Sequence, residues 1–242
     1  MLIILWYVYY GDYMEKIIEK KNIIKSLCAF LIFYFLPYIV IYGLRFLGIS
    51  FDGIDDKTRV LLNTILSLMT AIILFMIYSK DLKDDLIKFK SDLIRNVDTG
   101  FKCWFVGLII MMVSNLILNF VLNAGGANNE QAVQNLLSSL PAIMAIDVCI
   151  LAPFNEEIAF RKTIKDVFKN KWLFVILSFL LFGGAHVISS AQTLIDYLYI
   201  VPYGALGGAF AYAFYETDTI YTSMTMHFIH NTILVILSLF IL

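Results

Sequence analysis

Seven long apolar runs occupy most of the 242-residue sequence. A transmembrane helix needs about 20 predominantly apolar residues to cross a hydrocarbon core of roughly 30 Å. The seven runs are Ser26–Leu47, Val60–Tyr78, Phe101–Leu122, Leu140–Phe160, Trp172–Val187, Leu194–Phe214 and Ile220–Leu242. The pattern predicts an all-α, polytopic bundle of about seven membrane-spanning helices.

Composition supports a membrane protein and excludes several other classes. Hydrophobic residues make up 60% of the chain and charged residues 15%, against roughly 45–50% and about 25% in soluble domains. The net charge of -1 offers no basic excess for nucleic acid. Cys28, Cys103 and Cys149 form no CxxC pair. They are therefore expected to be free thiols rather than a disulfide framework or a zinc ribbon.

The basic residues predict the orientation of the bundle. Four precede the first run, six lie between the second run and the start of the third (Lys102 being the second residue of the third run), and five follow the fourth run. Only Arg45, Lys57 and Arg59 fall on the other side. Because Lys and Arg concentrate on the cytoplasmic side, the N-terminus is predicted inside and, with seven spans, the C-terminus outside.

Two further segments carry expectations about organisation. Residues Asp81–Arg95 place apolar side chains at helical spacing, which fits either an amphipathic helix on the inner leaflet or a solvated connecting helix. The first ten residues are apolar but too short to span, and Met14 is the expected functional start. We divide the chain into residues 1–139, with three spans, and residues 140–242, with the candidate catalytic helices.

Ionisable residues concentrate in the last four runs, where burial in lipid makes charge costly. They are Asp147, Glu156, Glu157, His186, Asp196, His227 and His230, and they include every histidine of the chain. Such residues in membrane segments predict a functional site.

The string EEIAFR, residues 156–161, suggests different roles for its two glutamates. Glu157 and Arg161 lie one helical turn apart and can form an ion pair. Glu156 then faces elsewhere, where a carboxylate in a low dielectric can take up a proton as a general base does. The alternative is that both glutamates are solvated at the inner interface.

Two other strings place polar groups on helix faces. FGGAH puts Phe182 and His186 on one face, beside small residues that allow close approach. HFIHN puts His227 and Asn231 on one face, with His230 nearby, where they could stabilise an oxyanion. Interhelical hydrogen bonding is the alternative for both strings, and spacing leaves open which histidine of HFIHN faces a site.

The motifs EExxxR, FxxxH and HxxxN, in this order over Leu140–Leu242, resemble those of the CPBP family. This is the family of CAAX-processing and bacteriocin-processing intramembrane proteases, also called Abi. The resemblance implies a CAAX-type, glutamate-dependent intramembrane endopeptidase. It also implies a membrane-associated or lipid-modified peptide or protein as the substrate.

The resemblance also implies roles for single residues. Glu156 with His186 would activate water, and His227 with Asn231 would stabilise the oxyanion. Glu157, Arg161 and Phe182 would support the site, and His230, which lies outside the family pattern, is expected to do the same. The family is often described as metal-dependent. A divalent metal such as zinc, with Glu156, His186 and His227 as candidate ligands, is therefore open, although the chain has no HExxH motif.

The remaining expectations concern the setting. We expect a protein of the bacterial plasma membrane, with its site toward the cytoplasmic half and lipid and a peptide or membrane-protein substrate as partners. Nucleic acid is not an expected partner, and the oligomeric state is left open. One alternative function is a non-catalytic membrane adaptor or bacteriocin-immunity protein of the same fold. A small transporter or proton relay is the other alternative, although no paired halves are visible.

Overall fold

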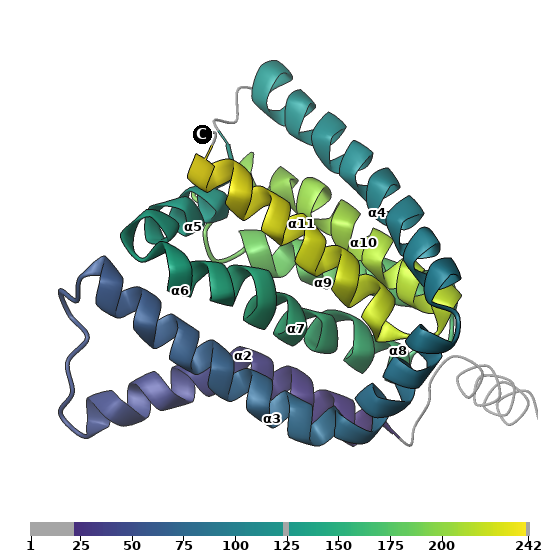
Figure 1. Cartoon of the computed structure of the whole chain (residues 1–242). Coiled ribbons are helices and arrows are strands. Elements are labelled where there is room, and N and C mark those ends of the chain that lie inside the picture. The colour runs from purple at the N-terminus through teal and green to yellow at the C-terminus, as the bar shows by residue number, and fades with distance from the viewer. Residues whose placement is uncertain (1–21, 123–125, 241–242) are drawn as a thin grey trace, which may run out of the picture.

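The computed structural model describes residues 22–122 and 126–240 (Figure 1). The apolar first ten residues and Met14 lie outside this part. Within it every regular element is helical and no strand occurs, so the all-α prediction is confirmed. The α-helices are α2 (Ile23–Phe46), α3 (Asp56–Ser91), α4 (Leu93–Leu116), α5 (Asn128–Ser139), α6 (Pro141–Ile146), α7 (Ala152–Glu157), α8 (Thr163–Val167), α9 (Lys171–Val187), α10 (Ile200–Thr217) and α11 (Ile220–Phe240).

Within the described residues, each predicted apolar run falls largely on helix. Four helical segments are long and apolar enough to cross a membrane on their own: Ile23–Phe46, Asp56–Ser91, Leu93–Val121 and Ile220–Phe240. The fourth run forms the irregular helix from α6 to α8, and α9 and α10 are shorter or less apolar. The polytopic helical bundle is therefore confirmed, and the number seven stays a prediction.

The segment Asp81–Arg95 is not a separate surface helix. It mostly continues α3, which runs for 36 residues before α4 begins at Leu93. Leu82 and Asp85 are buried against the bundle. This packing fastens one face of the end of α3 to the bundle, while most residues of the segment are exposed. The choice between an amphipathic helix on the leaflet and a solvated connecting helix stays a prediction.

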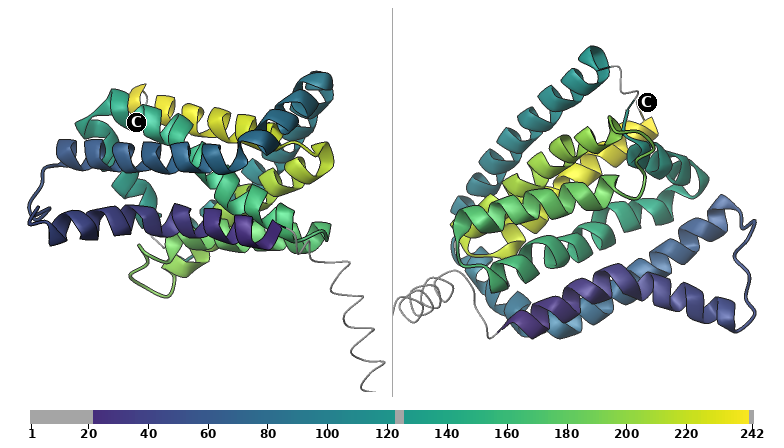
Figure 2. Two further views of the ribbon diagram at one scale, coloured as in Figure 1. Left: turned by 90° about the horizontal axis from the view of Figure 1, so that it is seen from below. Right: turned by 180° about the vertical axis from the view of Figure 1, so that it is seen from behind.

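The helices pack most closely around α10, which contacts α9, α4 and α11. A Cβ atom added to Gly183 would lie 2.5 Å from the Ile200 carbonyl, and one added to Gly107 would lie 2.7 Å from Ala209. Small residues therefore let these helices approach closely, as in other membrane bundles. The hairpin of α2 and α3 lies on one side of the bundle and α4 on the opposite side (Figures 1 and 2).

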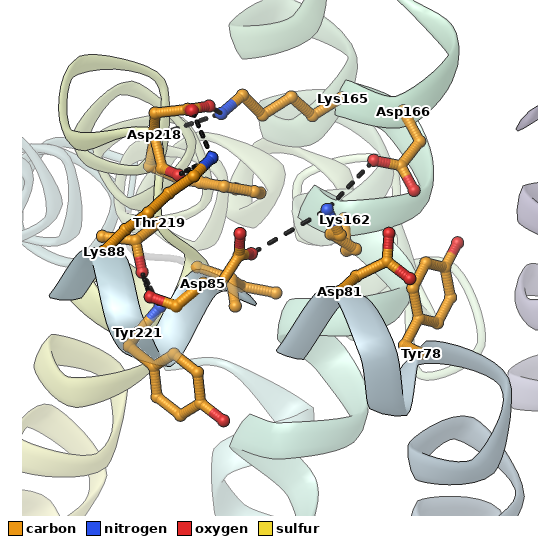
Figure 3. Close-up of polar contacts among 12 residues, drawn as sticks. Tyr78, Asp81, Asp85, Lys88, Lys162, Lys165, Asp166, Asp218, Thr219 and Tyr221 are labelled. Carbon is orange, nitrogen blue, oxygen red and sulfur yellow. Dashed lines mark hydrogen bonds and ion pairs between the residues drawn. The ribbon is translucent and has the colours of Figure 1, made fainter. Parts of the chain in front are cut away.

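One end of the bundle is held together by ion pairs (Figure 3). Lys162 lies 3.2 Å from Asp166 and 3.8 Å from Asp85. Asp218, in the turn between α10 and α11, pairs with Lys88 at 2.6 Å and Lys165 at 2.7 Å. Lysines from two of the predicted inner segments therefore meet at one end, as expected if those segments share one membrane face.

Candidate active site

The helix that carries the EExxxR motif is interrupted on both sides of its two glutamates. A π-helical segment, Asp147–Leu151, precedes α7, and a second one, Ile158–Lys162, follows it. Pro153 lies at the start of α7 and has no N–H to continue a regular helix. Such π segments are frequent at functional sites, where they change the direction in which side chains point.

The first π segment leaves one backbone carbonyl without a helical donor. The Ala152 N–H, which would serve Val148 in an α-helix, bonds to the Asp147 carbonyl instead. The donor for Val148 in a π-helix would be residue 153, which is proline. Asn231 Nδ2 donates to the Val148 carbonyl at 2.8 Å. The asparagine of HxxxN therefore joins α11 to the interrupted helix.

The predicted ion pair between Glu157 and Arg161 is present. Arg161 Nη1 lies 3.3 Å from Glu157 Oε1, and both side chains are fully buried. The guanidinium also lies 4.2 Å from the centre of the Phe182 ring, a favourable cation–π distance. Glu157 of the EExxxR motif and Phe182 of the FxxxH motif thus both pack against the buried guanidinium of Arg161.

His227 lies between the two adjacent glutamates. Its Nδ1 is 2.9 Å from Glu157 Oε1, and its Nε2 is 3.6 Å from Glu156 Oε2. An ionised carboxylate only accepts, so Nδ1 donates to Glu157 and Nε2 is left facing Glu156. A carboxylate that orients a histidine in this way is a recurring arrangement in hydrolytic sites. Sequence spacing could not reveal this contact, because its partners lie 70 residues apart.

His186 is held by its own helix and by aromatic rings. Its Nδ1 lies 2.9 Å from the Phe182 carbonyl, and its ring stacks on Tyr203 with centroids 4.8 Å apart. Since a carbonyl only accepts, Nδ1 carries the hydrogen and Nε2 of the neutral ring is free to accept. Among the described residues, no hydrogen bond or ion pair joins His186 to Glu156.

The two histidines of HFIHN differ in their surroundings. His227 meets the two glutamates, whereas His230 Nδ1 accepts a hydrogen bond from Trp104 Nε1 at 3.3 Å. Both are buried. Trp104 on α4 thus fixes His230, a contact for which the sequence carries no signal.

A cavity of about 510 Å³ brings most of the predicted site residues together. Glu156, Phe182, His186, His227, His230 and Asn231 line it. Glu157 and Arg161 lie behind its wall. Asn129, Glu130 and Gln134 from α5 also line it, and the sequence analysis missed them because they lie between the third and fourth apolar runs, outside the segments where site residues were expected. The helical spacing of Val133 and Leu137 was the available signal.

The other two ionisable residues of these runs serve elsewhere. Asp147 is buried in the first π segment. Asp196 lies in the loop before α10, where backbone N–H groups of Gln192 and Thr193 donate to it at 2.7 and 2.9 Å. These hydrogen bonds make Asp196 a residue that orders the loop.

The described side chains are not arranged as a set of metal ligands. Within residues 22–122 and 126–240, no three His, Cys, Asp or Glu side chains gather into a group that could hold a metal ion. The candidate ligands Glu156, His186 and His227 share the cavity without forming such a group. We therefore derive no chemical step through a metal.

Comparisons with known proteins agree with the motifs. Residues 138–233 match the family described as Rce1-like, type II CAAX prenyl endopeptidase. Over 140 residues the chain is 29% identical to "Putative membrane peptidase YdiL" of Bacillus subtilis (strain 168). The aligned region covers 56% of this chain and 54% of that protein. The match thus spans about half the length of this curated relative. No solved structure matches. The resemblance to the CPBP family is confirmed.

Proposed function

We propose that this integral membrane protein, whose residues 138–233 match the Rce1-like family, is an intramembrane endopeptidase. One observation carries the proposal: Glu156 and His227 face each other across 3.6 Å on the wall of a cavity of about 510 Å³. The Glu156 side chain is 16% exposed, whereas Glu157 is fully enclosed. Glu156 is therefore the carboxylate that can reach a water molecule and a substrate.

In the proposed reaction, Glu156 takes a proton from a water molecule. The water oxygen attacks the peptide carbonyl carbon, and the carbonyl oxygen becomes an oxyanion. Collapse of this intermediate breaks the C–N bond, and the leaving amine receives the proton from Glu156. His186, which lines the same cavity, offers its free Nε2 to the water, in keeping with the role inferred for it from the motif.

Two donors are available for the oxyanion. The Asn231 amide has two hydrogens, and Val148 occupies one of them. His227 donates from Nε2 when its ring carries a proton on both nitrogens, with Glu157 accepting from Nδ1. Glu157 holds His227 in place, Arg161 pairs with Glu157, and neither residue lines the cavity.

The substrate we propose is a membrane-associated or lipid-modified peptide or protein. The location between apolar helices supports this class, and the relative from Bacillus subtilis supports a bacterial plasma membrane. Placement of the site in the cytoplasmic half remains part of the proposal.

The test is cleavage by the purified chain in liposomes, with Glu156→Gln as the decisive variant. Loss of a general base lowers a rate by about 10²–10⁴-fold, so this variant should be inert while its thermal unfolding stays cooperative. Asp84→Asn, an exposed carboxylate on α3, is the matched control and should retain full activity. Equal activity of Glu156→Gln and the wild type would refute the mechanism.

Two rival functions give different outcomes. A non-catalytic adaptor predicts that Glu156→Gln leaves the cellular phenotype intact. A transporter or proton relay predicts flux into liposomes without peptide cleavage. Membrane proteomics of a Glu156→Gln strain should instead reveal an uncleaved precursor.

A further inference from the structure

The hydrogen bonds of the three histidines determine which ring nitrogen of each can serve a ligand in the cavity. Nδ1 of His186 donates to the Phe182 carbonyl, and Nδ1 of His227 donates to the Glu157 carboxylate. In a neutral ring the other nitrogen then carries no hydrogen, so both histidines have an acceptor at Nε2. While they are neutral, these two histidines cannot donate a hydrogen bond to a ligand.

His230 has the opposite arrangement. The indole N–H of Trp104 can only donate, so Nδ1 of His230 is the acceptor in the bond of 3.3 Å between them. The neutral ring must then carry its hydrogen on Nε2. Among the described residues Nε2 has no hydrogen-bond partner, and it is not one of the fully enclosed atoms that lack one. His230 therefore offers a free N–H to the cavity that it lines.

The indole reaches His230 because α4 packs closely against α10 and α11 (Figure 1). Gly100, Trp104 and Gly107 lie at positions i, i+4 and i+7, on one face of α4. A Cβ atom added to Gly100 would lie 2.9 Å from Thr222 Cγ2 on α11, and one added to Gly107 would lie 2.7 Å from a side chain of α10. A side chain at either position would move α4 and the indole away. The close packing of α4 therefore fixes the hydrogen of His230.

The part of the cavity wall that α11 forms is long enough to run beside a peptide. Residues at helical spacing on one face of α11 line it: His227, His230, Asn231, Leu234, Val235 and Ser238. At about 1.5 Å per residue this face is about 16 Å long, the length of roughly five residues of an extended peptide. His230 lies one turn, or about 4.5 Å, along the helix from His227. That distance corresponds to between one and two residues of the peptide.

We infer that Nε2 of His230 donates a hydrogen bond to a backbone carbonyl of the substrate, within two residues of the cleaved bond. This inference rests on the proposed function and adds a substrate-binding residue to it. A peptide carbonyl that leaves water for a largely apolar cavity needs a donor, and neutral His230 provides one. Trp104 does not line the cavity and is a positioning residue, because it keeps the hydrogen of His230 on the nitrogen that faces the substrate.

The first experiment detects this hydrogen directly. The full chain with ¹⁵N-labelled histidine is reconstituted in liposomes at about pH 8, where an ordinary histidine is neutral, and solid-state NMR distinguishes ring nitrogens with and without hydrogen. We expect one histidine with its hydrogen on Nε2, and His230→Phe should remove its signal. Trp104→Phe should shift His230 toward the other tautomer, and the matched control Trp172→Phe, at an exposed position of α9, should not. A wild-type His230 with its hydrogen on Nδ1 would overturn the inference.

The second experiment tests the contact with the substrate. An apolar peptide that the wild type cleaves is prepared with a thioamide, which is a weaker acceptor, in place of each amide within two residues of the cleaved bond. His230→Phe should raise KM about three- to tenfold, as expected for one hydrogen bond, with a much smaller effect on kcat. One thioamide should raise the KM of the wild type and leave that of His230→Phe unchanged. If every thioamide affects both proteins equally, or if His230→Phe keeps the KM of the wild type, the inference is wrong.

The two proposals fail in different ways. If the wild type cleaves the peptide without any dependence on His230, the inference fails and the peptidase stands. If the wild type cleaves no peptide, the proposed function fails, and the affinity of apolar peptides and their thioamide analogues then decides the role of His230. Weaker binding to His230→Phe, with no further loss from one thioamide, would support this role. Equal affinity for both proteins, or no binding to either, would overturn it.

Discussion

Asn231 offers a test that separates a structural role from a catalytic one. Its amide donates at 2.8 Å to a Val148 carbonyl whose helical donors are both absent. Replacing Asn231 with Leu removes the donor and keeps a similar volume. The carbonyl is then left without a partner inside the bundle.

The size of the effect follows from this geometry. A buried carbonyl that loses its partner costs about 1–3 kcal/mol. Hydrogen bonds in membrane bundles average about 0.6 kcal/mol and reach about 1.7. We therefore expect Asn231→Leu to lower the free energy of unfolding by about 1–2 kcal/mol. Pro153→Ala supplies an N–H at the position that would serve Val148 in the π register, so the double variant should recover much of that loss.

The assay is SDS-induced unfolding in mixed micelles, with peptide cleavage measured on the same samples. If the second Asn231 hydrogen also holds the oxyanion, Asn231→Leu lowers kcat by about 10²–10³-fold. Pro153→Ala cannot restore that loss, because it adds no donor at the cavity. If the double variant is no more stable than Asn231→Leu, the claim that the Val148 carbonyl depends on Asn231 for its hydrogen bond is refuted. Full activity of Asn231→Leu would refute the oxyanion role.

Two further predictions concern buried and surface charge. Arg161→Met removes the buried cation beside Glu157, which then keeps only its hydrogen bond with His227, and should cost about 3–5 kcal/mol in unfolding, while Glu157→Gln combined with Arg161→Met should recover part of this loss. Burial alone would raise the pKa of Asp218, but the hydrogen bonds from Lys165 and Lys88 outweigh burial, so the pKa lies below its usual value. The stability from this group is therefore present above about pH 4 and lost as the pH falls through the depressed pKa. Asp218→Asn should flatten this part of the pH profile of the unfolding midpoint, and Asp218→Ala should also strain a backbone at φ 52°.

The sequence predicted the elements of the fold well, because hydrophobic length alone decides where a helix crosses lipid. In the part of the chain that the structure describes, all seven apolar runs fall largely on helix. The helical spacing of Asp81–Arg95 predicted a helix, and the structure has one over most of the segment, but periodicity does not show that this helix is the partly buried end of a longer one. Contacts from elsewhere in the bundle, such as the hydrogen bond from Thr219 in the turn before α11 to the Asp85 carbonyl, are what bury part of this segment.

The site was predicted in part, with a clear boundary between local and distant contacts. The pair of Glu157 and Arg161 follows from helical spacing, and the structure contains it. The contacts of His227 with Glu157 and of Asn231 with Val148 depend on how α11 docks on a helix far away in sequence. Pro153 signalled an interrupted helix, but not which carbonyl would be freed or which side chain would bind it.

The interrupted helix also explains how two neighbouring carboxylates can have different environments. Successive residues of an α-helix point about 100° apart, so Glu156 and Glu157 necessarily face different neighbours. Glu157 meets Arg161 and His227 in the protein interior, and Glu156 meets the cavity. The π segments on both sides set the rotation of this short helix relative to α9 and α11. A substitution that regularised either segment would therefore turn both carboxylates together, and should impair activity more than the loss of one hydrogen bond would.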